Sequence, residues 1–149
     1  GAEVTVLSRT DAKKDDSLAF GAVRHVATGE DGALESLKRS FDIIINTISA
    51  PFSIDAYLRT LRPHGALVNV GLPPEALSMH IGSVISGRKV LAGSNIGSIK
   101  ETQEMLDFCA EKGIAPETEL ISADQINEAY DRTVAGDVRY RFVIDTATL

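Results

Sequence analysis

DIIINTIS, residues 42–49, joins three consecutive isoleucines to a short group of small polar residues. A near-continuous apolar run rich in β-branched residues is typical of a strand in a parallel sheet that is covered on both faces. The sequence predicts further strands of this kind at the ranges 3–8, 65–71, 89–95 and 140–145, and a shorter, weaker strand at 24–28.

Short amphipathic helices are predicted between these strands. Their ends carry recognisable signals, either a glycine or proline after the last turn or a side-chain cap before the first. The four predicted helices are 12–20, ending at Gly21; 53–62, stopping at Pro63; one opened by Ser98 and Glu101; and one opened by Ser122 and Gln125. Strands and helices that alternate in this way predict a doubly wound α/β sheet.

Apolar or small side chains recur at helical spacing in three of these helices, which predicts a buried face for each. The three stripes are Ile54, Tyr57, Leu58 and Leu61; Thr102, Met105, Leu106 and Cys109; and Ile126, Ala129, Tyr130 and Thr133.

Composition narrows the class of protein. The chain has 149 residues, 44% of them hydrophobic and 24% charged, which suits one globular domain. A net charge of −6 without a basic block argues against nucleic acid or an anionic membrane as a partner. A single cysteine fits a reducing compartment, and neither a signal peptide nor an apolar run of about 18 residues is present. We therefore expect a cytoplasmic protein.

Cationic and hydroxyl groups follow the first predicted strand, which ends in Ser8, Arg9 and Thr10, with Lys13 shortly after. Ligands of open parallel sheets bind beyond the carboxyl ends of the strands. Where NAD-binding folds place an acid, this chain offers charge-assisted donors that would match a 2′-phosphate. The alternative is a solvent-exposed turn in which Thr10 caps a helix and Lys13 and Lys14 lie on its outer face.

Three later strands also end in small residues. Thr47 and Ser49 follow the isoleucine run and could bind a ligand or cap the helix that begins at 53. Gly71 ends the strand 65–71, and its missing Cβ permits a positive φ or a close backbone approach. AGSNIGS, 92–98, leaves the next strand in the same way. Three consecutive strands with such ends favour a ligand site at that edge of the sheet.

Several catalytic patterns are missing from the sequence. It contains no G-x-G-x-x-G and no nucleophile elbow, so neither a pyrophosphate loop nor a catalytic triad is predicted. His25, His64 and His80 are widely spaced and match no zinc pattern, so we expect them at the surface or in loops. Cys109 is expected in the core.

Five segments carry a resemblance to a known family: GAEVTVLSRTDAKKDDSLAFGA, FDIIINTISAP, LRPHGALVNVGLP, GRKVLAGSNIGSIKETQEMLDFCAEKGI and INEAYDRTVAGDVRYRFVID. In this order they resemble the C-terminal half of a zinc-dependent medium-chain alcohol dehydrogenase. The branch is the cinnamyl-alcohol-dehydrogenase-like group, which includes bacterial NADPH-dependent aldehyde reductases. The resemblance covers essentially the whole chain.

The resemblance implies a Rossmann-like fold and hydride transfer between NADP(H) and a small alcohol or aldehyde, with a catalytic zinc that polarises the substrate oxygen. In this family the zinc ligands, the proton relay, the first strand and the glycine-rich loop would precede Gly1. Residues 1–149 are therefore expected to form a partial NADP(H)-binding domain with no catalytic residue and no metal ligand.

The resemblance also implies roles for thirteen residues. Ser8, Arg9 and Lys13 would grip the 2′-phosphate, and the others would line the ribose, nicotinamide and pyrophosphate. These others are Thr47, Ile48 and Ser49; Val70, Gly71 and Leu72; Ser94, Asn95 and Ile96; and Arg141, with Arg139 as its alternative.

The missing first strand has two expected consequences. It is central in the family's strand order, so the segments 3–8 and 42–46 should each keep an unpaired edge. Without that strand, its loop and the zinc, the chain alone should be catalytically inert and should bind NADP(H) more weakly than about 100 μM.

Residues 79–90 form a moderately apolar segment that the resembled family pairs across a two-fold axis, which implies a homodimer with residues 81–86 near the axis. An internally packed helix or loop is the alternative. Two other functions stay open: a non-enzymatic module for NADP(H) binding or oligomerisation, and a zinc-free quinone reductase of the same superfamily. Sequence upstream of Gly1 would discriminate between them.

Overall fold

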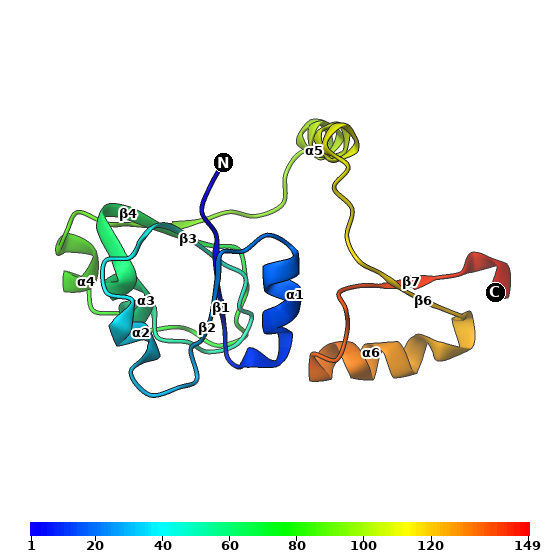
Figure 1. Ribbon diagram of the computed structural model, residues 1–149, viewed down its shortest axis with the longest axis horizontal. Helices are drawn as coiled ribbons and strands as arrows, with labels where there is room; N and C mark the ends of the chain where they lie inside the picture. The colour runs from blue at the N-terminus through cyan, green and yellow to red at the C-terminus, as the bar shows by residue number, and fades with distance from the viewer. The chain divides into compact units, whose positions relative to one another are not determined.

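The computed structural model describes residues 1–149, and the chain divides into two compact units, Gly1–Asn95 and Ile96–Leu149. Figure 1 shows the course of the chain. No helix combines the length and the apolar character needed to cross a membrane.

The first unit alternates parallel strands with short helices. Its elements are β1 (Thr5–Ser8), the 3-10 turn η1 (Asp11–Lys13), α1 (Lys14–Ala19), β2 (Arg24–Ala27), α2 (Ala33–Ser36), β3 (Phe41–Asn46), α3 (Ile54–Thr60), β4 (Leu61–Asn69), α4 (Gly82–Ile85) and β5 (Val90–Gly93). All five predicted strands of this unit are present, whereas α2 and α4 were not predicted.

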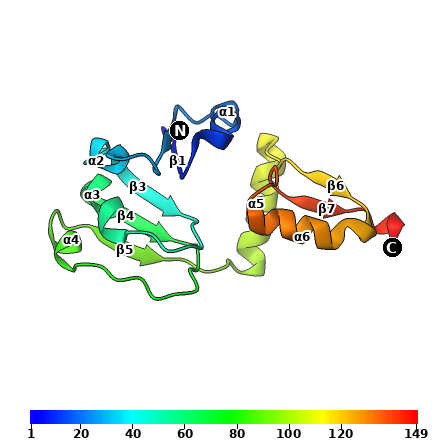
Figure 2. The ribbon, with the colours of Figure 1, turned by 90° about the horizontal axis from the view of Figure 1, so that it is seen from below.

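The strands form two parallel sheets, β1–β2 and β3–β4–β5. In Figure 2 the strands β3, β4 and β5 run side by side in one direction, so their carboxyl ends meet at one edge. β1 pairs only with β2, and β3 pairs at one side only, with β4. The parallel α/β fold and the two unpaired edges are therefore as predicted.

Helix α3 packs on one face of the three-stranded sheet and forms the core with it. The buried cluster is Ile44, Ile54, Tyr57, Leu58, Leu61 and Leu67. Ser53 caps the helix by accepting a hydrogen bond from the Ala56 N–H at 3.3 Å. The predicted stripe of this helix is confirmed, although the helix ends at Thr60 and β4 begins directly after it.

The opposite face of β3 is open. Ile43 and Ile45 are 65% and 68% exposed, while Ile44 and Asn46, which alternate with them, are buried. The expectation that both faces of this strand are covered is wrong for the first unit, because α3 lies on one face and no residue of this unit buries the other two isoleucines.

The second unit contains α5 (Ile99–Lys112), β6 (Glu119–Ile121), the 3-10 turn η2 (Ala123–Gln125), α6 (Ile126–Ala135), β7 (Phe142–Ile144) and the 3-10 turn η3 (Thr146–Thr148). β6 and β7 pair in parallel. Both capping boxes are present, Ser98 with Glu101 and Ser122 with Gln125. β6 was not predicted, since only three residues of the chain form it.

Apolar burial in this unit is sparse. No residue of α5 is buried, and Cys109 is only partly buried, so the prediction that it lies in a core is wrong. In α6 Ala129 is buried, but Tyr130 is 70% exposed. The helical stripes exist, but two strands and two helices offer too little apolar surface to cover them.

Arg132 joins the elements of the second unit. Its guanidinium donates to Glu119 at 2.7 Å and to Asp137 at 3.3 Å, and it lies 4.7 Å from the centre of the Phe142 ring. The hydrogen bond from Arg132, with a second from the Arg139 N–H, holds the pKa of Glu119 below its usual value. These contacts attach α6 to both β6 and β7.

The histidines differ from one another. His64 and His80 are exposed, as predicted. His25 is 8% exposed and lies inside β2, so the prediction of a surface or loop position is wrong for it. Burial of its two polar ring nitrogens is tolerated because each has a hydrogen-bond partner nearby.

Leu67→Ala should lower the free energy of unfolding by about 2–5 kcal/mol, because it opens a cavity in the core of the first unit. Leu67 is fully buried, whereas Leu72 is 85% exposed and provides the matched control. Leu72→Ala should change stability by less than about 0.5 kcal/mol. Chemical denaturation measures both, and equal losses would contradict this account of the core.

Candidate functional site

Two asparagines connect the carboxyl ends of β3 and β4. Asn46 and Asn69 stand opposite each other in the strand register, and the Asn46 Nδ2 donates to the Asn69 Oδ1 at 2.5 Å. The Asn69 amide in turn donates to the Gly71 carbonyl at 2.6 Å, and the Asn46 Oδ1 accepts from the Ile48 N–H at 3.2 Å. Each side chain therefore holds the segment that follows its own strand.

Backbone hydrogen bonds extend this arrangement across the sheet. The Asn46 carbonyl accepts from the N–H groups of Val70 and Gly71, at 2.9 and 3.1 Å. The Asn69 carbonyl accepts from the Ser94 N–H at 3.1 Å. We call Asn46, Asn69 and the segments 47–49, 70–72 and 94–95 the asparagine-linked group.

This group unites three of the segments that the sequence singled out, but sequence reasoning missed the asparagines that join them. The signal was present, because both apolar runs end in an amide residue. Only the register shows that the two amides face each other.

Gly71 is required by a close approach of two backbone segments. A Cβ at this position would lie 2.1 Å from the Ile48 carbonyl oxygen, far inside van der Waals contact. Its φ is not in the left-handed region, so of the two predicted reasons for a glycine the close approach is the correct one.

The alternative that Thr47 or Ser49 caps a helix is wrong, because Ser53 caps α3. The Ser49 hydroxyl instead accepts from the Leu72 N–H at 3.4 Å. Val70 and Leu72 on either side of Gly71 are 44% and 85% exposed. This edge therefore presents backbone groups beside apolar side chains, a surface suited to a flat ring.

A second group, the cationic turn, consists of Ser8, Arg9 and Thr10 at the end of β1. The Ser8 carbonyl accepts from the Thr28 N–H at 2.7 Å, and the Arg9 carbonyl accepts from the Gly29 N–H at 3.0 Å. The Arg9 side chain is exposed and forms no ion pair. Thr10 accepts from the Ala12 N–H at 3.4 Å, so the capping role considered for it is present.

The remaining predicted residues are placed separately. Lys13 ends η1, close to the cationic turn in sequence. Ile96 is 89% exposed at the start of the second unit. Arg141 is exposed before β7, where its carbonyl accepts from the Glu119 N–H at 2.8 Å. Ile96 and Arg141 both belong to the second unit.

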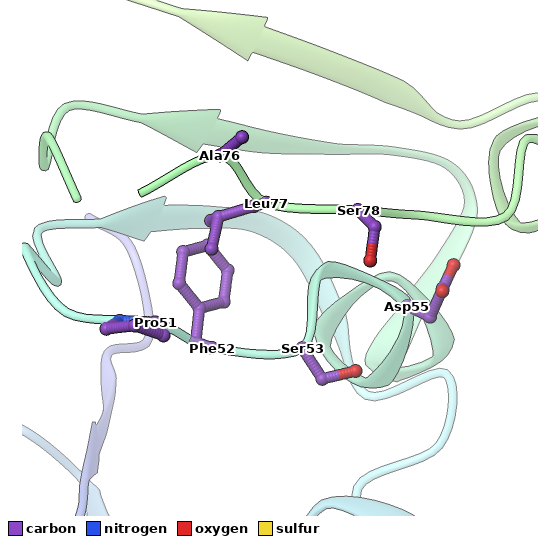
Figure 3. Close-up of a pocket in the computed structure, with 7 residues that line it drawn as sticks. All are labelled: Pro51, Phe52, Ser53, Asp55, Ala76, Leu77 and Ser78. Carbon is purple, nitrogen blue, oxygen red and sulfur yellow. The ribbon is translucent and has the colours of Figure 1, made fainter. Parts of the chain in front are cut away.

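No group of three or more histidine, cysteine or acidic side chains is placed to hold a metal ion. A shallow pocket of about 480 Å³ lies between the start of α3 and the segment 76–78. Figure 3 shows the Phe52 ring beside Leu77 in this pocket. Its lining contains none of the predicted site residues.

Comparison with known proteins gives consistent results. The protein-family model described as zinc-binding dehydrogenase matches residues 1–111. The chain is 51% identical, over 149 residues, to NADP-dependent alcohol dehydrogenase C 1 of Mycolicibacterium smegmatis, covering 100% of this chain and 43% of that protein. The chain thus spans less than half the length of the curated relatives that it matches.

Two solved structures are similar in fold and sequence. The cinnamyl alcohol dehydrogenase SbCAD4 of Sorghum bicolor matches with a TM-score of 0.93 and 37% identity, over 97% of this chain and 41% of that one. CAD from Helicobacter pylori, complexed with NADP(H), matches with a TM-score of 0.88 and 37% identity, over 99% and 42% of the two chains.

Gly71→Ala should destabilise the first unit by about 1–3 kcal/mol, because the added methyl group overlaps the Ile48 carbonyl. Gly93→Ala is the matched control, since its Cβ would lie at an ordinary 3.7 Å from the Asn69 carbonyl oxygen. Thermal or chemical unfolding measures the difference. A Gly71→Ala variant as stable as Gly93→Ala would show that the two segments are not in contact.

Proposed function

Because the chain belongs to the zinc-binding dehydrogenase family, as its sequence predicted, we propose that it binds NADP(H) as part of an alcohol dehydrogenase or aldehyde reductase. Residues 1–149 would form a partial cofactor-binding domain. The enzyme would transfer hydride between NADP(H) and a small alcohol or aldehyde. The observation that carries this proposal is the cationic turn at the end of β1.

The cationic turn suits the 2′-phosphate that distinguishes NADP(H) from NAD(H). Arg9 offers an exposed guanidinium without an internal partner, and the Ser8 and Arg9 carbonyls are engaged by Thr28 and Gly29. A charge-assisted hydrogen bond to a phosphate contributes about 1.5–3 kcal/mol. No acidic residue stands directly at the strand end to repel the anion.

The asparagine-linked group suits the rest of the cofactor. Thr47, Ile48 and Ser49 would line the ribose, and the Gly71 backbone between Val70 and Leu72 would lie against the nicotinamide ring. Ser94 and Asn95 would hold the carboxamide. The bound nicotinamide supplies the hydride chemistry, while this chain's residues bind and orient it.

Zinc does not fit the residues of this chain, since no suitable donor set is present. We therefore propose no catalytic residue and no zinc ligand within residues 1–149. We expect this chain by itself to reduce no aldehyde and to bind NADP(H) more weakly than about 100 μM, which corresponds to about −5.5 kcal/mol.

Arg9→Asp should weaken binding of NADP⁺ by about ten- to a hundredfold, because it removes a charge-assisted contact to the 2′-phosphate. Binding of NAD⁺, which lacks that phosphate, should change much less. Titrations of the chain followed by NMR measure both dissociation constants, even in the millimolar range.

Lys14→Asp is the control for that experiment, because Lys14 is a nearby exposed cation outside the proposed site and the charge change is the same. It should leave the ratio of the two dissociation constants close to that of the wild type. Equal losses of NADP⁺ and NAD⁺ binding in Arg9→Asp would refute the assignment of the 2′-phosphate site.

We also propose a homodimer through residues 81–86. Ile81 immediately precedes α4 and Ile85 is its last residue; the two are 60% and 70% exposed. The segment is held to α3 by the Asp55 carboxylate, which accepts from the His80 N–H at 3.1 and 3.2 Å. A hydrogen bond from the Ser83 side chain keeps the pKa of Asp55 below its usual value, and the hydrogen bond from the His80 N–H lowers that pKa further. An anchored segment with exposed isoleucines supports a symmetric contact.

Sedimentation equilibrium of the longer enzyme that this proposal implies should show a dimer at high micromolar concentration. Ile85→Asp should convert it to a monomer, because a carboxylate would be buried without a partner at the axis. Ile99→Asp alters an isoleucine that is 92% exposed elsewhere and should leave the dimer intact. A wild-type monomer under these conditions would disprove the proposal.

A further inference from the structure

The backbone carbonyls of the cationic turn contact hydrogen-bond donors from β2 and from the turn that follows β2. Thr28 donates to the Ser8 carbonyl through its N–H and also through its hydroxyl, the latter at 3.1 Å. The third carbonyl, that of Thr10, lies 3.1 Å from the Nε2 of His25. The carbonyls of Ser8, Arg9 and Thr10 are thus all engaged by residues 25–29.

His25 is the buried member of this support, with a side chain that has no exposed surface. A carbonyl oxygen can only accept, so the proton at this contact belongs to the Nε2 of His25. The Nδ1 lies 3.0 Å from the hydroxyl of Ser17 in α1. The Ser17 hydroxyl donates its hydrogen to the Lys13 carbonyl at 2.7 Å. The Asp11 carboxylate, 3.8 Å from Nε2, is the charged group that faces the ring.

The direction of these carbonyls matters for an anion. A carbonyl oxygen carries partial negative charge and would repel a phosphate if it turned toward the ligand. The donors of His25, Thr28 and Gly29 keep the three carbonyl oxygens directed at β2 and the turn that follows it. The exposed Arg9 guanidinium, which forms no ion pair, is then the group of the turn that attracts an anion.

We propose that His25 is a positioning residue for cofactor selectivity, and that its Nε2–H holds the Thr10 carbonyl away from the 2′-phosphate of NADP(H). This inference rests on the proposed function, because it takes the cationic turn as the phosphate site. His25 touches no ligand itself and acts only through the turn.

Gly29 belongs to the same support. A Cβ at this position would lie 2.6 Å from the Arg9 carbonyl oxygen, a separation that real side chains do not reach. The turn after β2 can therefore approach the Arg9 carbonyl only with a glycine at position 29. The N–H of that glycine then completes the set of donors behind the turn.

Two substitutions at position 25 separate the hydrogen bond from the bulk of the ring. In His25→Gln the side-chain amide can take the place of Nε2 and donate to the Thr10 carbonyl. In His25→Asn the shorter side chain reaches only the place of Nδ1, near Ser17. NMR titrations of the chain with NADP⁺ and NAD⁺ give the ratio of the two dissociation constants for each variant.

We expect His25→Asn to lower the preference for NADP⁺ over NAD⁺ by about three- to tenfold, the effect of one lost hydrogen bond. His25→Gln should keep the wild-type preference. A loss of packing would weaken both ligands alike and would not be rescued by glutamine. The proposal is overturned if both variants keep the wild-type ratio, or if both lose it equally.

Thr28→Val keeps the size of the side chain and removes only its hydroxyl donor to the Ser8 carbonyl. Because the Thr28 N–H still donates to the Ser8 carbonyl at 2.7 Å, this variant should keep the wild-type preference and is the matched control. If His25→Asn does not fold, His25→Leu replaces it, and an unchanged ratio in His25→Leu then overturns the proposal. A wild-type chain that binds NADP⁺ no more tightly than NAD⁺ would refute the proposed function itself, whatever the variants do.

Discussion

The parallel pairing of β3 with β4 is the constraint on which most of the first unit depends. It sets Ile44 beside Leu67, so that α3 can close the core over both strands. The same register sets Asn46 beside Asn69 at the carboxyl end. A slip of one residue would reverse the faces of the whole strand, exposing the core isoleucine and separating the two amides. The core and the asparagine-linked group therefore follow from one alignment.

The two parts of the candidate site use different chemistry. The cationic turn relies on a side-chain charge, and its carbonyls are bonded to donors from β2 and from the turn that follows it. The asparagine-linked group relies on backbone, with Gly71 allowing the closest approach. A cofactor that carries a phosphate at one end and a flat ring at the other needs both kinds of surface, which connects the fold to the proposed function.

Much of this arrangement was predictable from local patterns. The isoleucine run of β3, the capping box of α5 and the stripe of α3 each depend on neighbours within a few residues, and all three predictions are confirmed. The candidate segments were also correctly placed at strand ends. The contacts of Asn46, Asn69 and His25 were not predicted, because their partners are distant in sequence. The two asparagines are 23 residues apart, and His25 is 15 residues from Thr10.

The sequence by itself determined six of the seven strands, the capping boxes that open α5 and η2, and the family to which the chain belongs, because periodicity, caps and motifs are properties of adjacent residues. It did not indicate the short elements α2, α4 and β6. Only the tertiary structure decided which faces are covered. In the folded chain Ile43 and Ile45 are exposed, His25 is buried, and Cys109 is partly exposed. Burial depends on the surface that other elements supply, and an apolar stripe specifies a face to be covered without specifying what covers it.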